Sequence, residues 1–234
     1  MTGISIFGAS GRMGQAIAQA IEDRDDVRIA EHRPDVFVDF SVPEAVQEHV
    51  AAACAAGKPI LVGTTALTAE HHRLIDEAAS KVAVIQSANV SLGVNLLVHL
   101  VREAASRLDK DWDVEIVEMH HRLKVDAPSG TALMLGKAAA DGRGVDLDSI
   151  SDRGRDGAAG VRQPGHIGFA SLRGGTVAGD HQVIFATEGE RVELGHRAES
   201  RAIFAHGAIE AALWLAGKPA GRYTMADVLG LRLP

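Results

Sequence analysis

The sequence predicts an α/β protein in two lobes, and three observations support that fold class. Strand and helix signals alternate through the first ninety residues, and a glycine-rich turn follows the first strand. After residue 90 the alternation ends, and extended segments separated by Gly-Gly and Glu-Gly turns appear. Regular alternation favours a parallel sheet with right-handed crossovers, whereas short turns between extended segments favour antiparallel pairing. We therefore expect a Rossmann-like doubly wound parallel sheet, followed by an α+β lobe with a mostly antiparallel sheet.

The elements of the first lobe follow from apolar spacing and from residues typical of helix ends. Met13 and Ile17 recur at helical spacing. Pro43 suits a first helical turn and Gly57 a helix end, and Thr68 suits an N-cap. The expected helices cover residues 12–24, 43–56 and 69–81. The expected strands cover residues 3–8, 27–32, 34–41, 58–65 and 82–89.

The second lobe is predicted to begin with one long helix and to end with a run of strands. Expected helices cover residues 91–108, 131–140 and 203–217, and a Gly- and Asp-rich loop covers 141–165. One strand is expected at 112–121. Three further extended segments, 166–174, 176–187 and 190–198, follow in sequence, and we expect them to pair antiparallel.

Composition limits the classes of partner. The net charge of −7 argues against a nucleic-acid or anionic-membrane surface. The N-terminus lacks the layout of a signal peptide, and no stretch approaches the roughly 18 apolar residues of a membrane span. The single cysteine, Cys54, cannot form an internal disulfide. A cytoplasmic protein with a small-molecule partner, and neither nucleic acid nor membrane, is expected.

The turn "GASGRMG" after the first strand predicts a dinucleotide site. Gly8, Gly11 and Gly14 are spaced G-x-x-G-x-x-G, whereas the dinucleotide fingerprint usually reads G-x-G-x-x-G. The three glycines still permit the turn, the approach of backbone N–H groups to a pyrophosphate, and close helix packing. Glu31 is the candidate for holding the adenosine ribose, although the neighbouring His32 and Arg33 could accept a 2′-phosphate. This region therefore does not distinguish binding of NADH from binding of NADPH.

Polar residues follow the fourth and fifth expected strands. Ligands of open α/β sheets bind outside the carboxyl ends of the strands, so these residues are expected at the same site. The full set of expected cofactor-binding residues is Gly8, Ala9, Ser10, Gly11, Arg12, Met13, Glu31, Gly63, Thr64, Thr65, Ser87, Ala88, Asn89 and Val90.

The stretch "HHRLKVDAPSGTA" at residues 120–132 allows three interpretations. A metal site is disfavoured because neighbouring strand histidines point to opposite faces, and no metal is expected. A Ser-His-Asp hydrolase is disfavoured because Ser129 lies outside a G-x-S-x-G motif. The third interpretation is an anion pocket: Ser129-Gly130-Thr131 at a helix start seats a carboxylate, Lys124 neutralises it or donates a proton, and a histidine acts as general acid.

This stretch closely resembles the signature of the 4-hydroxy-tetrahydrodipicolinate (dihydrodipicolinate) reductase family. Further segments resemble the family in the same order along nearly the whole chain: "IFGASGRMG", "DVFVDFSVPE", "VGTT", "SANVSLGVN", "GHIGFASLRGG" and "FAHGAIEAALWL". The resemblance implies NADH- or NADPH-dependent reduction of a cyclic dicarboxylate in lysine and diaminopimelate biosynthesis. It also implies a homotetramer in which the sheets of the second lobes pack together.

The resemblance assigns roles to residues and to parts of the chain. His120 matches the acid/base histidine, Lys124 the proton-donating lysine, His121 a substrate-contacting histidine, and Ser129, Gly130 and Thr131 the seat of a substrate carboxylate. Residues 1–90, completed by 203–234, correspond to a dinucleotide-binding domain. Residues 91–202 correspond to a substrate-binding and oligomerisation domain.

The chain departs from the family pattern between its second and third strands. "VRIAEHRPDVFVDF" runs straight through where family members usually carry a longer insertion, which affects the Glu31 assignment. Two alternatives stay open: a non-catalytic nucleotide-sensing module of the same fold, and another two-lobed dehydrogenase. Loss of Lys124 or of the Ser-Gly-Thr turn would favour the module, and both are present.

Overall fold

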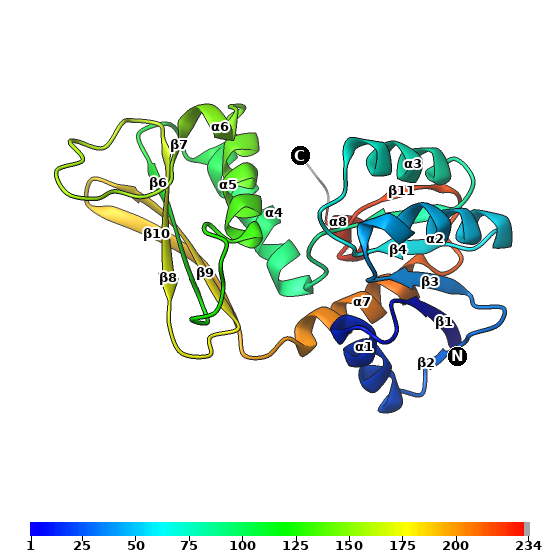
Figure 1. Ribbon diagram of the computed structural model, residues 1–234. Helices are drawn as coiled ribbons and strands as arrows, with labels where there is room; N and C mark the ends of the chain where they lie inside the picture. The colour runs from blue at the N-terminus through cyan, green and yellow to red at the C-terminus, as the bar shows by residue number, and fades with distance from the viewer. Residues whose placement is uncertain (232–234) are drawn as a thin grey trace. The chain divides into compact units, whose positions relative to one another are not determined.

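The computed structural model describes residues 1–231, and the chain forms two compact units (Figure 1). One unit contains Met1–Leu92 and the C-terminal segment from Ala202. The other unit begins at Gly93 and ends at Arg201. Residues 232–234 of the expected 203–234 segment lie outside the described residues.

The first unit is built on a parallel sheet in the order β11-β5-β4-β3-β1-β2. Its strands are β1 (Thr2–Phe7), β2 (Val27–Ile29), β3 (Val36–Asp39), β4 (Ile60–Val62), β5 (Ala83–Gln86) and β11 (Gly221–Tyr223). Because β2 lies on one side of β1 and β3 on the other, the strand order reverses there. The loops that leave β1 and β3 therefore lie at the position where doubly wound sheets bind ligands.

Helices cover both faces of this sheet (Figure 1). On one face α1 (Arg12–Glu22) and α7 (Ala202–Leu215) share an apolar core with β1, β3 and β4. On the other face α2 (Pro43–Ala56) and α3 (Ala69–Ala79) share a second core with β4 and β5. A short helix, α8 (Met225–Val228), follows β11. The doubly wound fold class is confirmed.

Local predictions in this unit are confirmed at the helix ends and incomplete at the C-terminus. The helix at 43–56 has the predicted bounds, and the Thr68 hydroxyl accepts a hydrogen bond from the backbone N–H of His71, as an N-cap does. The first strand has the expected length, and the next four are shorter than expected. The sequence predicted no strand after the last helix, yet β11 pairs with β5 and forms the edge of the sheet.

The second unit contains a mixed sheet in the order β10-β9-β6-β8-β7. Its strands are β6 (Asp113–His120), β7 (Ser151–Asp152), β8 (Ile167–Arg173), β9 (Gly179–Thr187) and β10 (Glu190–Ala198). The predicted antiparallel pairing is confirmed for β9 with β10 and wrong for β8 with β9. Instead β6, which precedes both strands in the sequence, lies between them, parallel to β8 and antiparallel to β9.

Two helices cover one face of this sheet. These are α4 (Leu92–Arg107) and α5 (Gly130–Arg143), whose apolar side chains pack against Val114, Ile116 and Phe185. The residues of β6 alternate between buried and half-buried along the strand, so its other side chains point to the uncovered face. The loop expected at 141–165 contains a short helix, α6 (Leu147–Ile150), and β7.

Candidate functional site

The glycine turn between β1 and α1 is held by contacts that leave no room for a side chain. Gly8 has φ +80°, and a Cβ there would lie 2.6 Å from the carbonyl oxygen of Phe40. A Cβ on Gly14 would lie 2.3 Å from the carbonyl oxygen of Gly8. Both positions therefore need glycine, one for its conformation and its neighbour, the other for the contact between helix and turn.

The start of α1 is open to a ligand. Gly11 is the N-cap and makes no side-chain cap hydrogen bond. A Cβ at Gly11 would meet only the Gly8 carbonyl oxygen, at 3.2 Å. Unsatisfied N–H groups and the positive end of the helix dipole make such a terminus suitable for a phosphate group. The residues around it, Ala9, Ser10 and Arg12, are exposed, and Met13 is half-buried.

The predicted polar strand ends lie side by side. The backbone N–H of Gly63 donates to the carbonyl of Asp39 at 2.8 Å, and that of Ser87 donates to the carbonyl of Val62 at 3.0 Å. These bonds continue the ladder beyond the ends of β3, β4 and β5. Among the remaining predicted residues, Thr65 and Ala88 are exposed, whereas Thr64, Asn89 and Val90 are buried.

A buried carboxylate that the sequence reasoning missed ties two of these strand ends together. Asp39 is fully buried, and its Oδ1 accepts from the Ser41 hydroxyl at 2.6 Å and from the Thr64 hydroxyl at 3.1 Å. Its Oδ2 lies 3.2 Å from Nδ1 of His49, whose ring stacks on Phe7. The Thr64 hydroxyl is thus used inside the protein. The sequence feature that could have identified Asp39 is an acidic residue at the end of an otherwise apolar strand, "VFVDFS".

Glu31 lies two residues beyond the end of β2 and is exposed, as are His32 and Arg33. Arg33 has φ +51°, a backbone conformation that is uncommon for a residue with a side chain. The connection from β2 to β3 is short. It carries the acidic Glu31 and the basic Arg33 within three residues of each other in the sequence.

In the second unit, His120 is held by a hydrogen bond to a buried carboxylate. His120 is 9% exposed, and its Nδ1 lies 2.6 Å from Oε2 of Glu118, two residues earlier on the same face of β6. Arg173, on the neighbouring β8, donates to both oxygens of Glu118, at 2.8 and 2.9 Å. Burial alone would raise the pKa of Glu118, but hydrogen bonds from Arg173, His120 and Ser171 lower it to about 2. Glu118 is therefore a carboxylate at neutral pH.

A second histidine lies between His120 and the start of α5. The rings of His120 and His181 meet edge to face, with 5.1 Å between their centroids. His181 Nε2 lies 3.0 Å from the hydroxyl of Ser129, the N-cap of α5, which also accepts from the N–H of Ala132. Burial, and the nearby His120, lower the pKa of His181 to about 4, so this ring is neutral at pH 7.

The remaining predicted residues lie on the segment between β6 and α5. The Lys124 ammonium donates to both carboxylate oxygens of Asp126, at 2.8 Å each, which lowers the pKa of Asp126. His121 Nε2 lies 3.1 Å from a guanidinium nitrogen of Arg201, a cation that the sequence reasoning did not identify. Gly130 and Thr131 form the first turn of α5.

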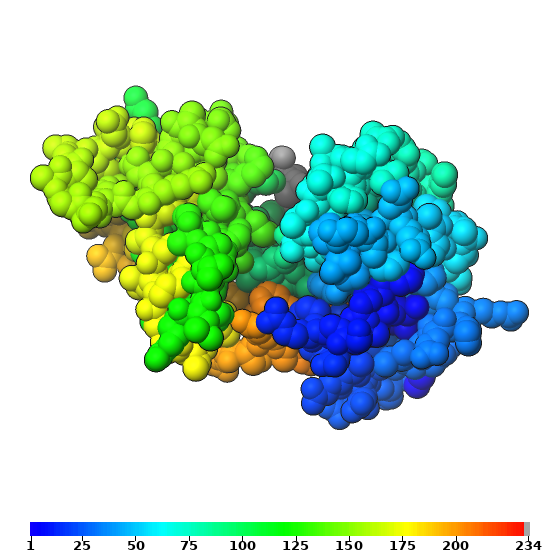
Figure 2. Space-filling view, viewed as in Figure 1, coloured from blue at the N-terminus to red at the C-terminus, as the bar shows by residue number. Residues whose placement is uncertain are grey.

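This segment lies at the surface of the second unit, where Figure 2 shows it in green. Two of its apolar side chains have few neighbours: Leu123 is 80% exposed and Val125 is 97% exposed. His120 and Ser129, at the two ends of the segment, are buried. The structure thus brings the predicted catalytic and substrate-binding residues together in one region of the second unit.

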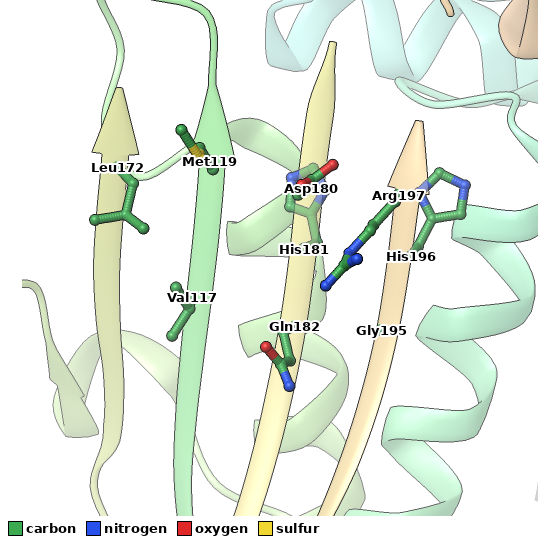
Figure 3. Close-up of a pocket in the computed structure, with 9 residues that line it drawn as sticks. All are labelled: Val117, Met119, Leu172, Asp180, His181, Gln182, Gly195, His196 and Arg197. Carbon is green, nitrogen blue, oxygen red and sulfur yellow. The ribbon is translucent and has the colours of Figure 1, made fainter. Parts of the chain in front are cut away.

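The uncovered face of the second sheet carries apolar side chains. Figure 3 shows Val117 and Met119 on β6 beside Leu172 on β8, with Gln182 and Arg197 on the next two strands. Leu172 is 50% exposed. The apolar part of this face is thus formed by Val117, Met119 and Leu172, with polar side chains of β9 and β10 beside it.

Residues 1–231 contain no group of three or more His, Cys, Asp or Glu side chains arranged to hold a metal ion. In the same part of the chain, no helix combines the length and the apolar character needed to span a membrane.

Comparison with family models matches both units. The model described as dihydrodipicolinate reductase, C-terminus, matches residues 93–229, and the model described as dihydrodipicolinate reductase, N-terminus, matches residues 2–32 and 25–90. The chain belongs to the dihydrodipicolinate reductase family. Because the family consists of reductases, the chain is an oxidoreductase that uses a nicotinamide cofactor. The N-terminal match breaks into two pieces at the short connection between β2 and β3.

Individual members of the family resemble the chain over almost its whole length. It is 55% identical to the 4-hydroxy-tetrahydrodipicolinate reductase of Zymomonas mobilis, with 97% of each chain covered. That alignment spans 246 positions, more than the 234 residues of this chain, so the relative carries residues that this chain lacks. Identity to the enzyme of the same name from Caulobacter vibrioides is 49%, over 98% of this chain and 97% of the other.

The fold of the family is also found among solved structures. The dipicolinate-bound dihydrodipicolinate reductase of Paenisporosarcina superposes with a TM-score of 0.80 at 24% identity, covering 97% of this chain and 98% of the other. A diaminopimelate dehydrogenase of C. glutamicum gives a TM-score of 0.56 at 13% identity, covering 97% of this chain and 93% of the other. The two-lobed arrangement of elements is therefore shared with reductases and dehydrogenases.

Proposed function

We propose that this chain reduces 4-hydroxy-tetrahydrodipicolinate to tetrahydrodipicolinate with NADH or NADPH, in lysine and diaminopimelate biosynthesis. The arrangement around His120 carries the proposal. An acid/base histidine backed by a buried carboxylate, an amine at Lys124 and the start of α5 lie together in the second unit. Each is a group that reduction of a conjugated cyclic dicarboxylate requires.

The residues of the first unit would hold the nicotinamide cofactor, which supplies the hydride when bound. The open start of α1, from Gly8 to Met13, suits the pyrophosphate. Residues 63–65 and 87–90, at the neighbouring strand ends, would contact the nicotinamide half, and Glu31 the adenosine ribose. Residues 1–90 and 203–234 thus act as the dinucleotide-binding domain.

The residues of the second unit would bind the substrate and move its proton. The start of α5, at Ser129, Gly130 and Thr131, seats one carboxylate, and His121 beside Arg201 contacts the substrate. The 4-hydroxyl group of the substrate leaves as water, and hydride addition to the conjugated ring that remains places negative charge on the ring, which the Lys124 ammonium stabilises. The single proton added at the adjacent carbon comes from the pair of acids His120 and Lys124, with His120 as the immediate donor. Lys124 must leave Asp126 to take part, and water can then hydrate the exposed Asp126.

The decisive experiment follows absorbance of the reduced nicotinamide after addition of freshly generated hydroxy-tetrahydrodipicolinate. NADH and NADPH are used in separate reactions, and nucleotide binding is measured in parallel. Rapid oxidation with at least one of them is expected, and the ratio of rates shows what the short β2–β3 connection does to cofactor choice. Binding without oxidation would instead support the nucleotide-sensing alternative.

We also propose that residues 91–202 assemble the chain into a homotetramer through the uncovered face of the second sheet. Val117, Met119 and Leu172 form the apolar part of that face, and an exposed apolar patch on a folded protein is typical of an interaction surface. L172D should reduce the molar mass measured by light scattering, whereas L123D, at the exposed segment, should not. A wild-type monomer would contradict the tetramer. The cytoplasmic location stays a prediction from the sequence.

A further inference from the structure

Glu118, the buried carboxylate beside His120, is neither a cofactor-binding nor a substrate-binding residue of the proposed function. Glu118 is 1% exposed, and donors from four residues surround it, one of them Ser171. Arg173 donates to both oxygens, the backbone N–H of Ser129 donates to Oε1 at 3.3 Å, and the ring of His120 reaches Oε2. Burial of a charge costs free energy unless the charge is paired, and these hydrogen bonds give both oxygens of Glu118 a partner.

The contacts decide which nitrogen of His120 carries the proton when the ring is neutral. A carboxylate can only accept hydrogen bonds, so Nδ1 of His120 must be the N–H that donates to Oε2. Nε2 then carries the lone pair and points away from Glu118. It lies toward Gly179, where a Cβ would come within 3.0 Å of it. Gly179 therefore leaves the space around the reactive nitrogen free of a side chain.

We propose that Glu118, held by Arg173, is a positioning residue that fixes the tautomer and orientation of His120, so that Nε2 is the atom that gives and regains the substrate proton. The inference rests on the proposed role of His120. The balance is simple: the cationic ring releases the Nε2 proton to the substrate carbon and becomes neutral with its proton on Nδ1. The N–H bond breaks, the C–H bond forms, and no oxidant or further reactant takes part.

The variant E118Q tests the positioning role of Glu118 with little change in side-chain volume. Arg173 donates to both oxygens, so the other partner decides the orientation of the amide. At Oε1 that partner is the Ser129 N–H, which can only donate, whereas at Oε2 it is Nδ1 of His120, which accepts in the other tautomer. The amide oxygen therefore belongs at Oε1 and the NH2 at Oε2. That NH2 points at Nδ1 of His120, which must then accept. The neutral ring of E118Q is thus protonated on Nε2 and cannot receive the proton that the mechanism requires there.

Nitrogen-15 NMR of histidine-labelled full-length protein reads the tautomer without any reaction. The His120 signal is identified by its loss in H120N. We expect the neutral ring to carry its proton on Nδ1 in the wild type and on Nε2 in E118Q. The same Nδ1-protonated tautomer in both proteins, both folded, would overturn the inference.

Kinetics supply the second measurement, as a double-mutant cycle. E118Q should lower kcat on the order of 10²-fold or more, the scale of misplaced general acid–base catalysis, with a small effect on KM. In the H120N background E118Q should lower kcat by less than about threefold, because the ring on which Glu118 acts is absent. Equal losses in both backgrounds would mean that Glu118 does not act through His120. If H120N itself retains wild-type kcat, the role of His120 fails instead, and the NMR result still stands by itself.

E115Q is the matched control. Glu115 lies on the same strand, is also paired with two arginines, Arg155 and Arg162, and has its pKa lowered by them against the effect of burial. It points to the other face of β6 and contacts no histidine. E115Q should leave kcat and the His120 tautomer unchanged, and a loss there equal to that of E118Q would overturn the specific role of Glu118.

Discussion

Replacement of His181 by glutamine should flatten the dependence of stability on pH. His181 titrates near 6.5 in an unfolded chain and at about 4 in the folded protein, because burial disfavours its charged form. The unfolded state therefore takes up a proton between these values and the folded state does not. The stability that His181 contributes is complete above pH 6.5 and is lost as the pH falls toward 4.

The size of the effect follows from the two pKa values. Between the two pKa values, the unfolding free energy changes by about 1.4 kcal/mol per pH unit for one proton. The interval from pH 7 to pH 5 includes about one and a half pH units of that range. Wild-type protein should thus lose about 2 kcal/mol more unfolding free energy than H181Q over that interval. Glu118 does not contribute there, since its carboxylate titrates below pH 5 in both states.

Urea unfolding at pH 7, 6 and 5 measures this, at one fixed protein concentration. The chain has two tryptophans, and Trp112 belongs to the second unit whereas Trp214 belongs to the first. Fluorescence in a W214F background therefore reports on the unit that contains His181. H32Q, at an exposed histidine of the other unit, is the control. Parallel loss of stability in wild type and H181Q would refute the burial argument.

Three further predictions concern activity and binding. Lys124→Ala should lower kcat by on the order of 10²-fold or more, as the loss of a general acid does, and a steady-state change below about threefold would contradict that role. Ser129→Ala should mainly raise KM, and an unchanged KM would argue against the carboxylate seat. Gly14→Ala should weaken NADH binding at least about tenfold in calorimetric titration, because the new Cβ would lie 2.3 Å from the Gly8 carbonyl and displace the turn; wild-type affinity would show that the turn tolerates the shift.

Local sequence signals predicted the local structure well. Pro43, Gly57 and Thr68 marked helix ends because caps and breakers act on the backbone beside them. The order of strands in the second sheet could not be predicted in the same way. Whether β8 pairs with β9 or with β6 depends on contacts between segments some fifty residues apart, and the Gly-Gly turn after β8 is equally compatible with both.

The candidate site shows the same division. His120, Lys124 and the Ser-Gly-Thr turn lie within one short stretch, so their chemistry was readable from the sequence. Glu118 could have been found, since residues two apart on a strand share a face. Arg173 and His181 reach His120 only through pairing of β6 with β8 and β9, which no local pattern encodes.

The place of α7 and β11 in the first unit has a consequence for synthesis of the chain. Residues up to Leu92 form five of the six strands, but α7, which buries one face of that sheet, leaves the ribosome only after the whole second unit has been made. At 5–20 residues per second this interval lasts on the order of 5–20 s. The part of this face that α7 covers stays exposed throughout that time, so chaperone demand should fall on the N-terminal segment rather than on the unit inserted into it.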